Sequence, residues 1–162
     1  MRICFLITCI LFFVNLRAQN TCEMGFVRDS LYNEKEGAFV GADGLRTNPF
    51  KDGGEVKIFK VGNKYYLMIF CKSHLYFDLA HDLEIRSGTK SMVQKGIKQI
   101  QKDKFTGFFV IEILKNYVAT LKDEGITSYV FNTKETFLSK SEVKEVKKIA
   151  NCFYQTINVQ KK

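Results

Sequence analysis

The chain has 162 residues, of which 46% are hydrophobic and 14% aromatic. This apolar content suffices for a packed core and excludes an intrinsically disordered chain, and the length fits one domain. The formal net charge of +8 excludes an acidic protein and leaves open an anionic partner. The lysines are spread along the chain, which is typical of a solvated surface rather than of a clustered binding site.

Residues 1–18 have the pattern of a secretory signal peptide. Arg2 supplies the positive start, an apolar run covers 3–14, and Ala18 is the small residue that a signal peptidase needs. The run is shorter than the roughly 20 apolar residues of a membrane-spanning helix. We expect cleavage near Ala18, export to the periplasm or the extracellular space, and a single globular domain over 19–162.

The N-terminal part of this domain, 19–54, is expected to be rich in loops. A strand is predicted at 26–32. The segment 37–54 then holds five of the eleven glycines together with Pro49, the only proline. Such residues favour turns and loops, so we expect 37–54 to separate the first strand from the main body.

A β-hairpin follows. Two runs rich in β-branched and aromatic residues, 56–61 and 64–71, are joined by Gly62 and Asn63. This pair fits a two-residue turn in which glycine takes a positive φ. The second run is apolar on both faces, which predicts a central strand. Further strands are predicted at 83–86, 91–94, 97–101 and 105–114, the last again apolar on both faces.

The segment 113–125 fits two structures. Its apolar spacing suits a helix, but Lys115 would lie near the N-terminus and two acidic residues near the C-terminus, and both placements oppose the helix dipole. No capping box precedes it either. We therefore prefer a hairpin with strands at 117–121 and 126–131, while the helix stays an alternative.

The clearest helix is C-terminal, over 139–157. Ser139 and Glu142 form a capping box. The apolar residues that follow recur at helical spacing and predict one buried face: Val143, Val146, Ala150, Phe153 and Ile157. The expected fold class is α+β, a mostly antiparallel curved sheet or sandwich with this C-terminal amphipathic helix packed on it.

Three cysteines remain once Cys4 and Cys9 leave with the signal peptide. Cys71 ends the predicted central strand, and Cys152 lies in the helix that should cover the sheet. We therefore expect Cys71 and Cys152 to lie nearer to each other than either lies to Cys22. Three cysteines allow at most one internal disulfide, and whether any two are bridged is left open.

One stretch gathers residue types that carry chemistry, in the order Cys71, His74, Asp78, His81 and Asp82. Cysteine and histidine form a nucleophile–base pair, so the catalytic candidates are Cys71, His74, Asp78 and His81. Cysteine, histidine and carboxylate also bind zinc, so the metal candidates are Cys71, His74, His81 and Asp82. The spacing matches no established motif, and the alternative is a strand end followed by a polar connection.

Glu112 is a further catalytic candidate, because a carboxylate in an apolar strand can have a raised pKa. The alternative is a carboxylate that faces water or pairs with a lysine. No nucleotide-binding loop, zinc-protease motif or nucleophile elbow occurs, and no cofactor is predicted.

The Ala18–Gln19 cleavage context resembles that of small exported proteins of Gram-negative bacteria. A β-rich exported chain that closes with a helix also resembles the lipocalin outline. The chain has no tryptophan, so the Gly-x-Trp motif of that family is missing. The resemblance therefore extends to the fold outline alone and implies no site residues.

These observations favour an exported, non-enzymatic binding or interaction module of the cell envelope or extracellular space. The partner would be an envelope or extracellular protein, with an anionic polymer or lipid surface as a weaker possibility, and no specific nucleic acid is predicted. Two alternatives stay open. One is a carrier of small apolar ligands, and the other is a metal- or thiol-dependent enzyme that uses the stretch 71–82.

Overall fold

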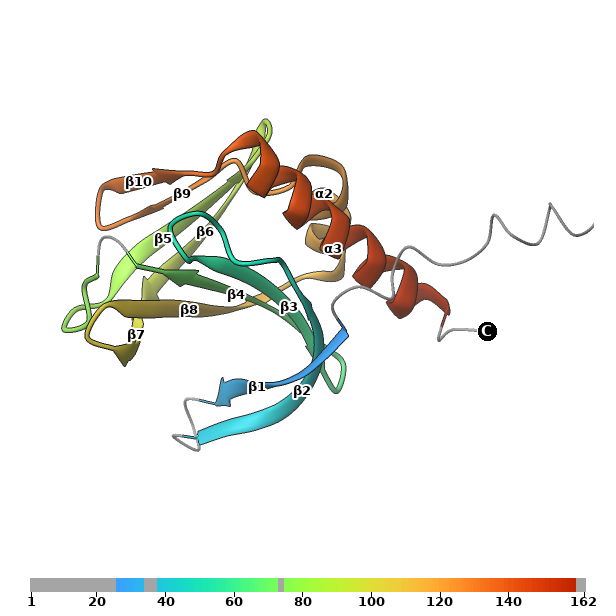
Figure 1. The fold of residues 1–162 in the computed structure, drawn as a ribbon, viewed down its shortest axis with the longest axis horizontal. Coiled ribbons are helices and arrows are strands. Elements are labelled where there is room, and N and C mark those ends of the chain that lie inside the picture. The colour runs from blue at the N-terminus through green and yellow to red at the C-terminus, as the bar shows by residue number, and fades with distance from the viewer. Residues whose placement is uncertain (1–25, 34–37, 73–74, 160–162) are drawn as a thin grey trace, which may run out of the picture.

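Antiparallel sheets and two helices make up the part of the chain that the computed structural model describes, which is residues 26–33, 38–72 and 75–159. Side chains are described for 44–72 and 75–158. The α+β class expected from the sequence is confirmed, with curved antiparallel sheets and a C-terminal helix against them (Figure 1).

The larger sheet has six strands in the order β1-β2-β3-β4-β8-β7, and every neighbouring pair is antiparallel. It curves strongly toward its β1 edge (Figure 1). The strands are β1 (Phe26–Asn33), β2 (Ala38–Arg46), β3 (Glu55–Val61), β4 (Lys64–Cys71), β7 (Ile100–Asp103) and β8 (Thr106–Ile113).

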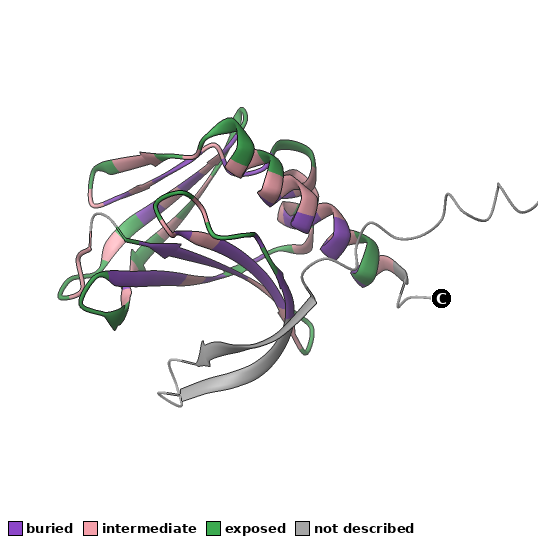
Figure 2. Ribbon diagram, in the orientation of Figure 1, coloured by how far each residue is buried: buried purple, intermediate pink, exposed green. Residues whose placement is uncertain are grey.

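The centre of this sheet is the predicted hairpin of β3 and β4, with β8 beside it. Gly62 in the turn has a φ of 57°, as a two-residue hairpin turn with glycine first requires. Alternate residues of β4 enter two cores: Leu67 and Ile69 join the main one, and Met68 and Phe70 join a second cluster on the opposite face. Figure 2 shows β4 and β8 buried along most of their length, which confirms their central positions.

The smaller sheet has four antiparallel strands in the order β10-β9-β5-β6. They are β5 (His81–Ser87), β6 (Lys90–Ile97), β9 (Ser128–Phe131) and β10 (Lys134–Phe137). The predicted strands at 83–86 and 91–94 are thus confirmed, whereas the strand predicted at 97–101 begins only at Ile100, because Ile97 closes β6.

The expectation of a loop over 37–54 is wrong for its first half. β2 occupies 38–46 and pairs with both β1 and β3, so only 47–54 is a connection. Gly44 shows why glycine belongs in this strand: a Cβ there would overlap the ring of Phe59 and the carbonyl oxygen of Ile58. Gly44, one of the glycines that predicted a loop, instead permits close packing within the sheet.

The preferred hairpin at 117–121 and 126–131 is also wrong, since the first of these segments lies in helix α2 (Lys115–Glu124). Val118 and Leu121 are fully buried, each contributing about 1.5–3 kcal/mol, whereas unfavourable charges at helix ends cost about 0.3–1 kcal/mol each. Packing against helix α3 (Lys140–Val159) and β5 therefore outweighs the dipole. Gly125, with a φ of 72°, ends α2 by donating its N–H to Leu121 O at 2.9 Å.

Helix α3 begins with the predicted capping box. Ser139 N–H donates to Glu142 Oε2 at 2.7 Å, and Glu142 N–H donates to Ser139 Oγ at 3.4 Å. Val146, Ala150 and Phe153 are buried in the main core, as the periodicity predicted. Neither described helix has the length and apolar character needed to cross a bilayer.

Candidate functional site

Cys71 lies at the end of β4 and is 2% exposed. Gln99, itself buried, donates its Nε2–H to Cys71 Sγ at 2.9 Å, and the thiol donates to Gly107 O at 3.4 Å. Gln99 Oε1 also accepts the N–H of Tyr76 at 2.7 Å. Cys71 is thus one member of a hydrogen-bonded network that joins β4, β8 and the connection before β5.

Burial raises the pKa of the Cys71 thiol from its ordinary value of about 9 to about 11. The hydrogen bond from Gln99 opposes this shift but does not overcome it. At neutral pH the thiol stays protonated, and the nucleophilic form of cysteine is the thiolate. Gln99, which belongs to no recognisable sequence motif, therefore helps fix a structural thiol.

The other residues of the stretch 71–82 point to different surroundings. His74 lies outside the described residues. The His81 ring packs edge-on against Phe131, with centroids 5.3 Å apart. Asp78 is exposed. Asp82 in β5 accepts the N–H of Gly96 in β6 at 3.2 Å, and this hydrogen bond links the start of β5 to the end of β6.

Within the described part of the chain, no three histidine, cysteine or acidic side chains gather where they could hold a metal ion. His74 is not among these residues, so a metal site involving His74 stays a prediction. The described candidates instead serve packing and local hydrogen bonds.

Glu112 forms an ion pair with Lys64, whose Nζ lies 2.7 Å from Glu112 Oε2. Both side chains are about half exposed. This is the pairing with a lysine that the sequence offered as the alternative to catalysis, and it raises the pKa of Lys64 through the hydrogen bond and charge of Glu112.

Cys152 is disulfide-bonded, and Cys71 is a free thiol, so the two are not joined to each other. Both belong to the same buried cluster. Cys22 lies outside the described residues. The expected order of distances among Cys22, Cys71 and Cys152 therefore stays a prediction.

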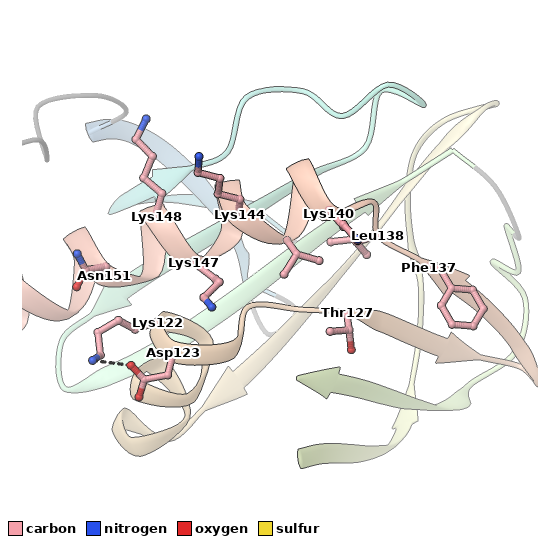
Figure 3. A pocket seen from close by; sticks show the side chains of 11 residues that line it. Lys122, Asp123, Thr127, Phe137, Leu138, Lys140, Lys144, Lys147, Lys148 and Asn151 are labelled. Carbon is pink, nitrogen blue, oxygen red and sulfur yellow. Dashed lines mark ion pairs between the residues drawn. The ribbon is translucent and has the colours of Figure 1, made fainter. Parts of the chain in front are cut away.

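The structure also contains a feature that the sequence did not predict, an open groove of about 940 Å³ along the outer side of α3. We call it the lysine groove. One wall is α3, and the other is the end of α2 with Thr127, which precedes β9; Phe137, the last residue of β10, lies at one end (Figure 3). Its lining includes five lysines and one carboxylate: Lys122, Lys140, Lys144, Lys147, Lys148 and Asp123.

The side chains of the lysine groove are arranged along its length (Figure 3). Lys147 points from α3 toward Lys122 and Asp123 of α2, while Lys144 and Lys148 extend outward from the same helix. Lys122 forms an ion pair with Asp123, since its Nζ lies 2.7 Å from Asp123 Oδ1.

The four α3 lysines of the groove differ from three described cations that are held by glutamates. Lys57, Lys64 and Arg86 each form an ion pair with a glutamate. Within the described residues, no carboxylate pairs with any α3 lysine that lines the groove. The lysine groove is therefore a concentration of uncompensated positive charge.

A signal for this groove was present in the sequence at positions 140, 144, 147 and 148, which share one helical face. The spread of lysines along the whole chain instead favoured a solvated surface. Part of the second wall is helix α2, which the preferred hairpin left out.

A second pocket, lined by Phe50, Ile126, Tyr129 and neighbouring residues, has a volume of about 20 Å³. That is room for about one water molecule and far below the roughly 300 Å³ of a small-ligand site. It gives no support to the apolar-carrier alternative.

Comparison with known proteins adds no functional information. No protein-family model matches the chain, and neither a curated protein nor a solved structure matches it.

Proposed function

We propose that this protein is an exported, non-enzymatic binding module that recognises an anionic partner through the lysine groove. The observation that carries the proposal is the row of α3 lysines without a described carboxylate partner. An anionic ligand would neutralise the positive charge of these lysines, which no described carboxylate does.

The spacing of these lysines gives the proposal its physical basis. Lys140, Lys144 and Lys148 are four residues apart on one helix, so successive positions are about 6 Å apart. Two such charges repel by about 0.7 kcal/mol in water. A bound anion replaces this repulsion by attraction, and it gains most where several cations face it together.

Export is part of the proposal and rests on the signal-like N-terminus and on the cysteines. A disulfide at Cys152 suits an oxidising compartment, because disulfides persist outside the cytosol. The buried, protonated Cys71 thiol supports a binding role over thiol catalysis.

The test is binding of three polyanions at low and high salt: polyglutamate, a sulfated oligosaccharide, and vesicles containing phosphatidylglycerol. The groove variant is Lys144→Gln/Lys147→Gln/Lys148→Gln. We expect at least one probe to bind the wild type, and the groove variant to lose about tenfold in affinity for it.

A matched control separates a groove from net charge. Lys90→Gln/Lys95→Gln/Lys98→Gln removes the same three charges from exposed positions on and beside β6. We expect this variant to bind within about twofold of the wild type once salt screens long-range attraction. Equal losses in both variants would show that only net charge matters and would overturn the proposal.

A further inference from the structure

We infer, building on the proposed function, that the ligand of the lysine groove is an extended acidic peptide segment with an apolar side chain at one end. The partner would then be a protein with such a segment rather than a lipid surface or a polysaccharide. The inference rests on how the chemistry of the groove changes along its length.

One end of the groove is apolar. It is lined by Phe137, Leu138 and Val143, and Phe137 is 74% exposed. A phenylalanine that leaves most of its ring in water has apolar area to bury on binding. Figure 3 shows Phe137 at the end of the groove away from Asn151.

The middle of the groove is cationic, and the far end is polar. Beyond the α3 lysines, Asn151 closes the lining. Its side-chain amide has no hydrogen-bond partner among the described residues. A side-chain amide can both donate and accept, which matches the N–H and C=O groups of a peptide backbone.

The length of the groove fits a short peptide. From Lys140 to Asn151 the helix rises by about 17 Å, since each residue adds about 1.5 Å. An extended chain covers this distance with about five residues at roughly 3.3 Å each. Alternate side chains of such a chain lie about 6.6 Å apart, close to the spacing of lysines four positions apart on α3.

This combination disfavours the other anionic partners. A lipid bilayer is broad and flat, whereas Lys147 points from α3 toward Lys122 and Asp123 of α2 across a groove. A sulfated or carboxylated sugar chain would satisfy the lysines but would cover less apolar area on Phe137 and Leu138 than an aromatic or aliphatic side chain. An acidic peptide with a terminal aromatic or aliphatic residue satisfies the apolar end, the cations and the amide together.

The test uses fluorescein-labelled peptides and fluorescence anisotropy on the full mature chain. One pair of probes has consecutive glutamates with phenylalanine at either the first or the last position, and the matched pair has alanine there. We expect one phenylalanine peptide to bind more tightly than its alanine counterpart by about threefold to tenfold. Phe137→Ala should remove this preference and leave the affinity for the alanine peptide unchanged.

The lysine dependence separates the inference from the proposed function. Lys144→Gln/Lys147→Gln/Lys148→Gln should weaken all acidic peptides about tenfold, with circular dichroism confirming that the fold is retained. Groove-dependent binding of vesicles or the sulfated oligosaccharide with no peptide binding would overturn the peptide inference and leave the proposed function standing. A wild-type preference for phenylalanine that persists in Phe137→Ala would also overturn it. Failure of every probe to depend on these lysines would overturn both.

Discussion

The two faces of helix α3 have opposite surroundings: one is buried in the core, and the other lines an open groove. One face places Val146, Ala150 and Phe153 in the main core. The other places Lys140 and Lys144 with two further lysines in an open groove. The first face stabilises the fold, and the second adds repulsion between like charges that folding does not relieve.

A single helix can therefore hold the core together on one face and leave charged side chains accessible to a ligand on the other. Cys71, at the end of β4, is the chemically more reactive residue type, but it is buried and its raised pKa keeps the thiol protonated at neutral pH. The lysines are chemically simple, but they stay accessible and without described carboxylate partners. In this molecule, the accessible set is therefore the better candidate for function.

Truncation of the buried face should have the largest effect. Phe153→Ala removes a ring that is 5% exposed and packs edge-on against Tyr65, with centroids 6.2 Å apart. We expect the free energy of unfolding to fall by about 3–5 kcal/mol, measured by urea denaturation. Phe137→Ala makes the same chemical change on the groove side and should alter stability by less than about 0.5 kcal/mol. Similar losses in the two variants would erase the contrast between the faces.

Loss of the disulfide should have the next largest effect. Cys152 is buried on α3, and Cys152→Ser breaks its covalent link. We expect a fall of about 2–4 kcal/mol in the free energy of unfolding. Peptide mapping without reductant would identify the bonded cysteine. If the melting temperature of the wild type is the same with and without reductant, and all its thiols are free, the disulfide at Cys152 is contradicted.

The pH dependence of Cys71 tests whether this residue belongs to the structural set. The native pKa of about 11 lies above the ordinary value, so the unfolded chain loses the thiol proton first as the pH rises. The associated stability is complete below pH 9 and is lost between about pH 9 and 11. By pH 11 the wild type should lose about 2 kcal/mol more than Cys71→Ala does over the same range. Parallel pH profiles for the two proteins would contradict a buried, protonated thiol.

The smallest effect is expected at the turn between β9 and β10, away from both faces of α3. Asn132 and Thr133 have positive φ values of 47° and 65°, as in a type I′ turn. A β-branched residue is strained there, so Thr133→Gly should raise the free energy of unfolding by about 1 kcal/mol. The gain should appear in urea denaturation without a change in ligand binding. A destabilised variant would show that the threonine side chain contributes more than the strain costs.

Local patterns predicted the elements whose structure is set locally. The Gly62 turn, the doubly apolar β4 and the Ser139 capping box each depend on neighbours within a few residues, and each is found as expected. The segment 115–124 could not be assigned this way, because burial of Val118 and Leu121 against other elements decides its structure. The lysine groove was missed for the same reason, since part of one of its walls is this helix.

The candidate residues of the stretch 71–82 show a second limit of sequence reasoning. Their types suggested chemistry, but convergence depends on direction. Cys71 faces the core, His81 packs on Phe131, and Asp82 binds the backbone of β6. The buried partner of Cys71, Gln99, carries no recognisable motif and comes into contact only through the pairing of β7 with β8.

Ligand binding in the lysine groove is tested most directly by titrating the ¹⁵N-labelled mature protein with the acidic peptides and following its NMR chemical shifts. If the lysine groove binds the ligand, the largest changes will fall on the amides of 137–151 and 122–127, and they will vanish in Lys144→Gln/Lys147→Gln/Lys148→Gln. Changes spread evenly over exposed lysines elsewhere, or centred on the 71–82 stretch, would contradict the account.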